Sequence, residues 1–340
     1  MVGTAPVRPT APPALGAVLL LAGCAGRQTP LAPAGMQAGA TFDLFTLMLL
    51  VGGAAYGAVL LFLAIAMWRA SQRPLAEPQL EPADPGLRAA LWLWGAAVVT
   101  GLVVLAGGSF VVERALASAR TRETLLVRVT AHQWWWRIAY RDPASGAWIE
   151  TANELHLPVD LTARIELGSS DVIHSFWVPN VAGKMDVVPG RRNALDVTPR
   201  RIGWFRGQCA EFCGAQHAHM ALDVKVDSAA DFAAWLAAQA RPATAPRDSG
   251  AARGLAVITT GPCGLCHVVR GTRATGRAGP DLTHLASRRS VAAGLFPMSR
   301  GAVQGWIAQP QALKPGTMMP AVSLSAADAD AVSHYLVGLK

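Results

Sequence analysis

The amino-acid sequence predicts a membrane-anchored chain of three parts: a two-helix transmembrane hairpin, an all-β sandwich and a small all-α domain at the C-terminus. Three features predict it: two long uncharged stretches near the N-terminus, alternating apolar residues in the middle, and helical periodicity towards the end. The composition agrees, because 52% of the 340 residues are hydrophobic and 15% are charged, against about 25% charged in a typical soluble protein. A wholly soluble globule is therefore excluded.

The first 23 residues have the pattern of a signal peptide. Arg8 precedes an apolar stretch from Ala14 to Ala22, which is too short for a membrane span but suits a cleaved signal. The small residues before Cys24 resemble the cleavage site of a bacterial lipoprotein, so we expect lipidation of Cys24. Ordinary signal cleavage is the alternative. Residues 24–41 then form an N-terminal segment that leads to the membrane.

Two transmembrane helices follow. The sequence has uncharged stretches of 25 and 24 residues, and about 20 residues suffice to cross a bilayer as a helix. Two buried helices of a soluble protein are the alternative. Basic residues occur on both sides of the second stretch, so charge bias does not orient the hairpin. The predicted hairpin occupies residues 42–113, with spans at about 43–68 and 89–112.

Residues 123–240 have the pattern of an antiparallel β-sandwich. Short runs such as TLLVRVTA and LTARIELG alternate apolar and polar residues and end at Pro, Gly, Asn or Asp, as strands do. The Pro- and Ala-rich residues 241–249 interrupt this pattern as a linker. Residues 250–340 have helical periodicity, with Ser325 and Asp328 as a capping box. The apolar face of the last helix comprises Val332, Tyr335, Leu336 and Leu339.

Charge is unevenly distributed between these two parts. Residues 123–240 contain 11 basic and 13 acidic residues, whereas residues 250–340 contain 9 basic and 3 acidic residues. Opposite net charges favour transient electrostatic docking of two tethered domains, with ordinary surface variation as the alternative. The net charge of the chain is +8, but no run of Lys and Arg exceeds two residues, so we expect no binding of nucleic acid.

Soft metal ligands are concentrated in the segment 207–220, GQCAEFCGAQHAHM, with His174 upstream in DVIH. Within twelve residues the segment brings together Cys209, Cys213, His217 and Met220. Sulfur together with imidazole favours copper in electron transfer, and zinc has no use for the methionine. A disulfide between the two cysteines, and His219 in place of His217, are the alternatives.

A second pair of cysteines predicts covalent haem. In the pattern CxxCH, Cys263 and Cys266 form thioethers to the haem and the adjacent His267 is an axial ligand of the iron. A redox-active cysteine pair is the alternative. Haem of this kind is attached outside the cytoplasm, which places everything after the second span on the outer side of the membrane. The five cysteines are then accounted for by lipid, copper and haem.

The motifs HQWWW at 132–136, DVIHSFWVP, KMDVVPGR and the segment 207–220 resemble subunit II of the haem–copper cytochrome c oxidases, over roughly residues 40–240. The resemblance implies a cupredoxin-like Greek-key sandwich that holds the dinuclear copper centre CuA. The implied copper ligands are His174, Cys209, Cys213, His217, Met220 and the backbone carbonyl of Glu211, with the cysteines bridging both coppers. The Glu211 carboxylate would also reach a magnesium site shared with subunit I.

Trp134 matches the tryptophan through which electrons reach the copper in that family, with a purely structural place in the core as the alternative. His132 and His156 are expected to be structural. The C-terminal domain is similar to a small class I cytochrome c, in which a methionine completes the haem iron. Met319, directly before a proline, matches that pattern, with Met318 as the alternative.

The combination resembles the oxidases whose subunit II carries a fused cytochrome c. It implies that electrons from cytochrome c or an upstream reductase reach the haem, then the copper pair, then haem a of subunit I, where oxygen is reduced with proton translocation. The resemblance gives this chain no catalytic residue of its own and implies oxidase subunits I and III as partners. It also implies two membrane passes in the bacterial inner membrane, with the copper and haem domains on the periplasmic side.

One feature departs from the family. Members often begin the second span with a Glu that admits protons to subunit I, whereas residues 86–92 contain no carboxylate; Glu77, Glu81 or Asp84 could substitute. Three other functions are alternatives. A quinol oxidase subunit lacks the copper ligands, and a nitrous oxide reductase needs a far longer chain. The remaining alternative is a membrane-tethered electron carrier or copper-handling lipoprotein without an oxidase.

Overall fold

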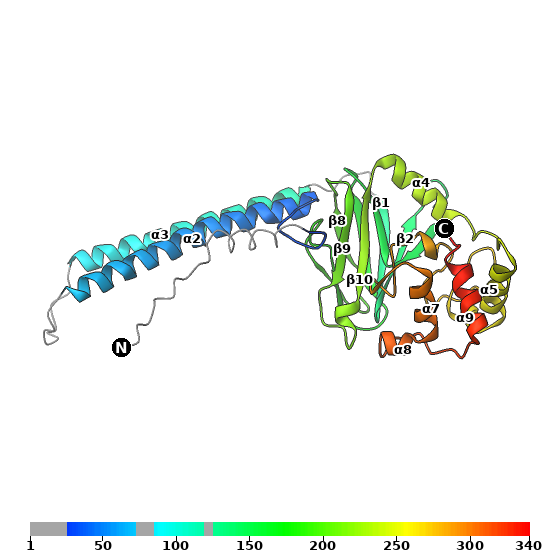
Figure 1. Cartoon of the computed structure of the whole chain (residues 1–340). Helices are drawn as coiled ribbons and strands as arrows, with labels where there is room; N and C mark the ends of the chain where they lie inside the picture. The colour runs from blue at the N-terminus through cyan, green and yellow to red at the C-terminus, as the bar shows by residue number, and fades with distance from the viewer. Residues whose placement is uncertain (1–25, 73–84, 119–124) are drawn as a thin grey trace, which may run out of the picture. The chain divides into compact units, whose positions relative to one another are not determined.

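The computed structural model describes residues 26–72, 85–118 and 125–340 (Figure 1). These residues form two compact units, one of 26–38 with 125–340 and the other of 39–72 with 85–118. The predicted signal peptide and Cys24 lie outside the described residues, as do the three acidic residues between the predicted spans.

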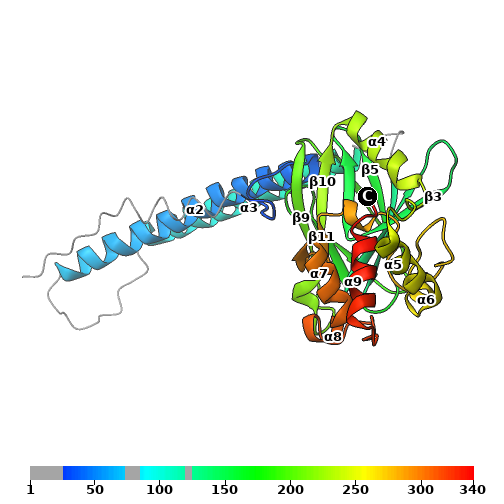
Figure 2. The ribbon, with the colours of Figure 1, turned by 45° about the vertical axis from the view of Figure 1, so that its right-hand side comes forward.

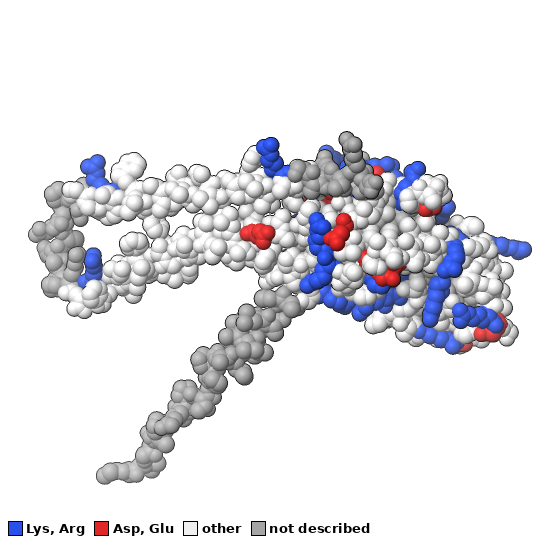
Figure 3. Space-filling model, turned by 90° about the horizontal axis from the view of Figure 1, so that it is seen from above, with Lys and Arg blue, Asp and Glu red and all other residues white. Residues whose placement is uncertain are grey.

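Two long helices, α2 (Met36–Ser71) and α3 (Pro85–Ser118), contain the predicted spans. Both are long and apolar enough to cross a membrane, with mean hydropathies of 2.3 and 2.1 and no burial within the protein over their most apolar stretches. Figure 3 shows them almost free of charged side chains. The two helices approach closely at Gly108, where an added Cβ would lie 2.7 Å from a methyl of Leu47. The absence of burial argues against the alternative of a buried helix pair.

Residues 125–227 form a sandwich of two five-stranded sheets (Figure 1). The first has the order β3-β2-β1-β5-β8 and the second the order β4-β10-β9-β6-β7. The strands are β1 (Leu125–His132), β2 (Trp135–Arg141), β3 (Trp148–Ala152), β4 (Glu154–Pro158), β5 (Ala163–Ser169), β6 (His174–Trp177), β7 (Met185–Val187), β8 (Asn193–Val197), β9 (Gly203–Cys209) and β10 (Ala221–Asp227). The expected antiparallel pairing is wrong for two pairs, β1 with β5 and β4 with β10, which are parallel.

Alternation of residue type produces these strands. In β1, every second residue from Leu125 onward is buried, because successive side chains of a strand point to opposite faces. Trp136, Tyr140 and Phe176 are among the largest fully buried side chains of the core between the sheets. The segment before α2 also packs on the sandwich, since the buried Asn180 side chain accepts a hydrogen bond from Thr29 and donates to two further backbone carbonyls of the segment.

A helix that the sequence analysis missed, α4 (Ala229–Ala240), ends this domain. Its N-cap is Ser228, whose side chain accepts a hydrogen bond from the backbone N–H of Asp231. Trp235 of α4 stacks on the ring of His156, with centroids 4.0 Å apart. His156 lies buried between the carboxylates of Asp227 and Glu154, which confirms its structural role.

The C-terminal domain, residues 249–340, is mainly helical. Its helices are α5 (Ser249–Thr260), α6 (Cys263–Cys266), α7 (Arg300–Ala308), α8 (Pro310–Leu313) and α9 (Ala326–Leu336), with a two-residue hairpin of β11 (Ser290–Val291) and β12 (Phe296–Pro297). Figure 2 shows α5, α7 and α9 packed together. The predicted cap is confirmed, because the Ser325 side chain accepts from the backbone N–H of Asp328. All four predicted apolar residues are buried, although the last helix ends at Leu336 and Leu339 lies beyond it.

Candidate functional site

The predicted copper ligands converge at one end of the sandwich. The segment between β9 and β10 carries Cys213, His217 and Met220, and Cys209 ends β9. Strand β6 lies beside β9, with Phe176 opposite Cys209. This pairing brings His174, the first residue of β6, against the loop, so a ligand 35 residues upstream of Cys209 joins the cluster.

The donor atoms lie within contact distance of one another. The Sγ atoms of Cys209 and Cys213 are 3.7 Å apart. Nδ1 of His174 lies 3.8 Å from Sγ of Cys209, and Nδ1 of His217 lies 3.6 Å from Sγ of Cys213. Sδ of Met220 lies 3.8 Å from Sγ of Cys213. This arrangement offers two thiolates between two imidazoles, which is a donor set suited to copper.

The two cysteines are thiols rather than a disulfide, because a disulfide bond would bring the sulfur atoms to about 2.05 Å. The Cys209 thiol also lies 3.2 Å from the backbone carbonyl of Glu211. A hydrogen bond from Cys213 lowers the pKa of Cys209, and the same proton, held between two buried sulfurs, raises the pKa of Cys213. A thiolate and a thiol that share one proton in this way carry the negative charge that attracts a cation.

Residues around the cluster orient the ligands. Oδ1 of Asp171 lies 2.8 Å from Nε2 of His174, so the other ring nitrogen faces the sulfurs, as is common for metal-ligating histidines. His219, the alternative to His217, instead turns Nδ1 to the side-chain oxygen of Gln216 at 2.8 Å. The carboxylate of Glu211 is exposed, on the surface beside the loop.

Trp134 contacts the loop directly. It is 7% exposed, and its ring Nε1–H donates to the backbone carbonyl of Cys213 at 2.9 Å. Gln133 donates to the same carbonyl at 2.7 Å. The predicted electron-accepting tryptophan is therefore attached to the loop that carries the thiols. Gln133 and Asp171 were missed as supporting residues, although Asp171 stands in the quoted motif three residues before His174.

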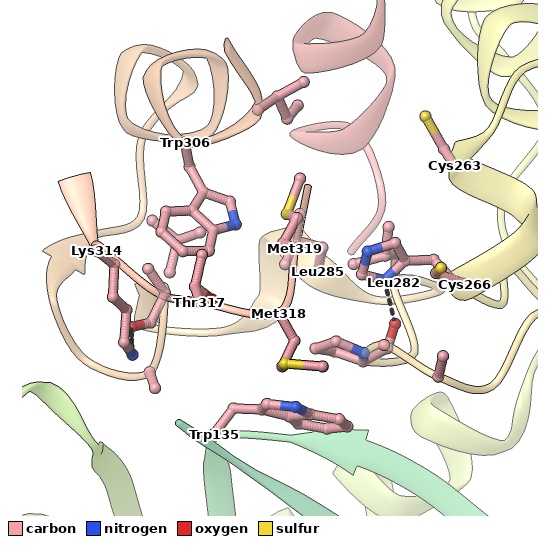
Figure 4. Close-up of a pocket in the computed structure, with 18 of the residues that line it drawn as sticks. Trp135, Cys263, Cys266, Leu282, Leu285, Trp306, Lys314, Thr317, Met318 and Met319 are labelled. Atoms are coloured by element: carbon pink, nitrogen blue, oxygen red, sulfur yellow. Dashed lines mark hydrogen bonds between the residues drawn. The ribbon is translucent and has the colours of Figure 1, made fainter. Parts of the chain in front are cut away.

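The residues predicted to attach haem line a cavity of about 490 Å³, a volume typical of sites for large ligands. Its lining is mostly apolar and includes Cys263, Cys266, His267, Trp306, Met319 and Trp135. Figure 4 shows Trp135, from β2 of the sandwich, on one side of this cavity and Met319 across from it. The cavity is thus closed partly by the helical domain and partly by the sandwich.

The ring of His267 is held for ligation. Its Nδ1 lies 2.8 Å from the backbone carbonyl of Pro280, which leaves the other ring nitrogen available to a metal. Burial lowers the pKa of His267, and this favours the neutral imidazole that ligates iron. Gly279 lies against the ring, where a Cβ would come within 2.5 Å of Cε1. Only glycine permits this approach.

The two candidate methionines point in different directions. Met318 is 79% exposed, and Figure 4 shows its side chain directed towards Trp135. Met319 is half-buried, and its side chain lies on the face away from Trp135 (Figure 4). The position of Met319 is the one that suits a ligand inside the cavity.

Comparison with known proteins gives two family matches. Residues 143–227 match "Cytochrome C oxidase subunit II, periplasmic domain", and residues 251–340 match "Cytochrome c". The cytochrome c oxidase subunit 2 of Alkalihalophilus pseudofirmus is 31% identical over 95% of this chain and 94% of its own length. That of Bacillus subtilis is 30% identical over 95% of each chain. The crystal structure of the periplasmic domain of cytochrome oxidase subunit II from Bradyrhizobium japonicum is 32% identical over 34% of this chain and 94% of its own, with a TM-score of 0.32.

Proposed function

The chain belongs to the cytochrome c oxidase subunit II family, in the form with a fused cytochrome c domain, and from this premise we propose that it is the electron-accepting subunit of a terminal oxidase. Electrons from an external donor would reach the helical domain first, the thiol cluster second and subunit I last. The observation that carries the proposal is the cluster of two thiols, two imidazoles and a thioether, with neighbouring donors 3.6 to 3.8 Å apart.

Six groups of this chain would hold a pair of copper ions, which would supply one-electron redox chemistry. Cys209 and Cys213 lie at the centre of the cluster and would supply the two thiolates that hold the copper pair. The other four groups are His174, His217, the Met220 sulfur and the Glu211 carbonyl. A rigid sandwich that fixes these ligands limits their movement when the charge changes, because β6 and β9 are paired to each other at the cluster. The exposed Glu211 carboxylate remains for a magnesium ion shared with subunit I.

The cavity of the helical domain would hold a haem. Cys263 and Cys266 would bind it covalently, and His267 and Met319 would supply the axial ligands. Trp134 and Trp135 are consecutive residues, of which the first donates a hydrogen bond to the Cys213 carbonyl and the second lines the cavity. This dipeptide therefore contacts both sites, through a hydrogen bond at one end and a packing contact at the other, and we assign it the role of the electron path.

The remaining assignments concern the membrane and partners. Helices α2 and α3 would cross the bacterial inner membrane, and the sandwich and helical domain would lie on the periplasmic side, where haem is attached. Oxidase subunits I and III are the proposed partners, and cytochrome c or a reductase complex the proposed donor. The proposed domain organisation has six parts: a signal peptide (1–23), an N-terminal segment (24–41), the transmembrane hairpin (42–113), the sandwich (123–240), the linker (241–249) and the helical domain (250–340).

The test uses the complete chain produced in membranes together with its oxidase partners. His217→Gln should abolish oxygen consumption with reduced cytochrome c while leaving the haem content and the partner subunit unchanged. The matched control is His334→Gln, at a partly exposed histidine of α9 whose ring pairs with Asp248, and it should keep full turnover. Normal turnover in His217→Gln would refute the copper assignment. A chain that purifies without any haem-bearing membrane subunit would instead be a tethered electron carrier.

A further inference from the structure

Lys314, in the helical domain, lies at the edge of the proposed haem cavity, and its buried ammonium has no part in holding either redox centre. The residue is 2% exposed, and its ammonium donates three hydrogen bonds to backbone carbonyls: Trp134 at 2.8 Å, His219 at 2.8 Å and Ala292 at 3.1 Å. An ammonium has three N–H groups, so each one is matched. Burial lowers the pKa of Lys314 to about 7, and the electrostatic influence of Cys213 acts in the opposite direction.

The acceptors lie on both sides of the boundary between the domains. Trp134 and His219 belong to the sandwich and adjoin the thiol cluster, since Trp134 donates to the Cys213 carbonyl and His219 directly precedes Met220. Ala292 belongs to the helical domain. One side chain thus connects the domain that carries the proposed copper ligands to the domain that carries the proposed haem cavity.

The residues after Lys314 extend the same contact. The carbonyl of Pro315 accepts a hydrogen bond from the side chain of Gln216 at 2.9 Å. Gly316 has φ +82°, and a Cβ there would lie 3.5 Å from the ring of Trp134, so this turn lies on the indole. Met319 follows three residues later, and Figure 4 shows Lys314 and Met319 on the same loop. The loop with the proposed axial methionine is therefore seated on the copper segment.

A strained turn faces the sandwich from the other side of Lys314. Ala292 and Ala293 have φ of 57° and 62°, which is left-handed backbone that alanine adopts rarely. The carbonyl of Ala292 accepts from Lys314, and the carbonyl of Ala293 accepts from the backbone N–H of Ala221 at 3.1 Å. Such a conformation persists where its surroundings hold it, and here the surroundings include residues of the sandwich.

We propose that Lys314 locks the helical domain onto the sandwich, so that the fused domain is permanently docked rather than a tethered carrier that binds and releases. Lys314 is then a positioning residue, which holds the haem cavity at a constant distance from the thiol cluster. Its role in electron transfer rests on the proposed function, but the docking itself does not. The three acceptors of Lys314 are uncharged carbonyls, so this contact differs from the electrostatic docking expected from the net charges of the two domains.

The strength of the contact between the two domains can be measured only after the linker is cleaved. A short linker gives the tethered domain a high effective concentration, so a weakened interface would remain closed in the intact chain. We would insert the recognition sequence of a specific protease between Ala245 and Pro246 of the complete, haem-loaded chain in detergent. After cleavage, size-exclusion chromatography measures how much of the C-terminal fragment stays bound.

The unsubstituted chain should retain the fragment after cleavage. Lys314→Met fills the same volume without the donors and leaves three carbonyls unpaired, which should raise the dissociation constant of the fragment at least about 10-fold. Lys314→Gln keeps two N–H donors on a shorter side chain, so its fragment should have a dissociation constant between those of the unsubstituted chain and Lys314→Met. This variant replaces Lys314→Met in the test if Lys314→Met does not fold. Lys184→Met, at an exposed lysine of the sandwich, is the matched control and should retain the fragment.

Release from the unsubstituted chain would overturn permanent docking, and full retention in both Lys314 variants would overturn the role of Lys314. A second readout addresses positioning in the uncleaved chain. In Lys314→Met, the rate at which an external donor reduces the haem should be unchanged. Electron transfer from haem to copper should slow at least about 10-fold. The distribution of distances between the two centres, measured by pulsed paramagnetic resonance, should broaden. Unchanged transfer and distances would overturn positioning. Absence of a copper signal would count against the proposed function alone, because fragment release is measured without it.

Discussion

Replacing Asp171 by Asn tests how the copper ligands are oriented. Oδ1 of Asp171 lies 2.8 Å from Nε2 of His174, and Oδ2 accepts from the backbone N–H of Gln133 at 2.7 Å. The substitution Asp171→Asn preserves the shape of the side chain and can still accept a hydrogen bond from the imidazole. It removes the negative charge, which orients the ring and raises its basicity as a ligand.

The expected loss of copper affinity follows from the difference between the charged hydrogen bond that Asp171 makes to His174 and the neutral one that asparagine would make. A hydrogen bond to a charged group contributes about 1.5–3 kcal/mol and a neutral one about 0.5–1.5 kcal/mol, so the charge accounts for about 1–1.5 kcal/mol. That difference corresponds to about a tenfold weaker binding of copper. The Asp171 side chain is 28% exposed, which places the effect at the lower end of the 10- to 100-fold range typical of residues that support metal ligands.

The assay is a competition titration of copper against a chelator, performed on the complete chain and followed by paramagnetic resonance. Asp186→Asn is the control, because Asp186 is an exposed residue of β7, the strand paired with the one that carries His174. We expect weaker binding and altered copper hyperfine splitting in Asp171→Asn and no change in the control. Equal affinity and identical spectra in both variants would refute the claim that Asp171 orients a copper ligand.

Three further predictions concern the haem cavity and stability. Gly279→Ala should displace His267, since its methyl would lie 2.5 Å from Cε1, and the low-spin haem spectrum should be lost; a normal spectrum would contradict the proposed axial ligand. Met319→Leu should abolish the absorption band of methionine-ligated haem and lower the reduction potential, whereas Met318→Leu should change neither; the reverse result would exchange the two assignments. Burial opposes protonation of His156, but hydrogen bonds to two buried carboxylates outweigh this effect and raise the pKa of His156 above 6.5. Protonated His156 therefore stabilises the fold fully below pH 6.5. This stabilisation is lost progressively as the pH rises through the raised pKa. The free energy of unfolding in denaturant should fall over that window and His156→Gln should remove the fall; an unchanged pH dependence would exclude His156 as its origin.

The parts of the site that could be predicted from the sequence are those built from residues close together in the chain. Cys209 and Met220 are eleven positions apart in one loop, and the haem pattern from Cys263 to His267 is contiguous. The chemistry of such a set is evident from its spacing because the ligating residue types occur together in a short stretch of sequence, whereas His174 joins the cluster only through the pairing of β6 with β9. The two membrane helices were predictable for a similar reason, since length and composition alone decide them.

The parts that could not be predicted depend on contacts between distant residues. Lys314 and its acceptor Trp134 are separated by 180 positions, and nothing in the local sequence of either indicates the other. The parallel pairing of β1 with β5 was missed because alternation specifies which face of a strand is buried but not the direction of its neighbour. Helix α4 was missed because the alternating pattern before it was extended to the linker, although Ser228 is a good N-cap.

The central claim is that this chain holds a haem and a pair of copper ions. The most direct measurement determines copper, haem and protein together in the complete, purified chain and records the paramagnetic resonance spectrum of its oxidised form. We expect two coppers per haem, with one unpaired electron shared equally by both coppers. Haem without such a copper pair would show that the segment from Cys209 to Met220 is not a working copper site and would refute the proposed function.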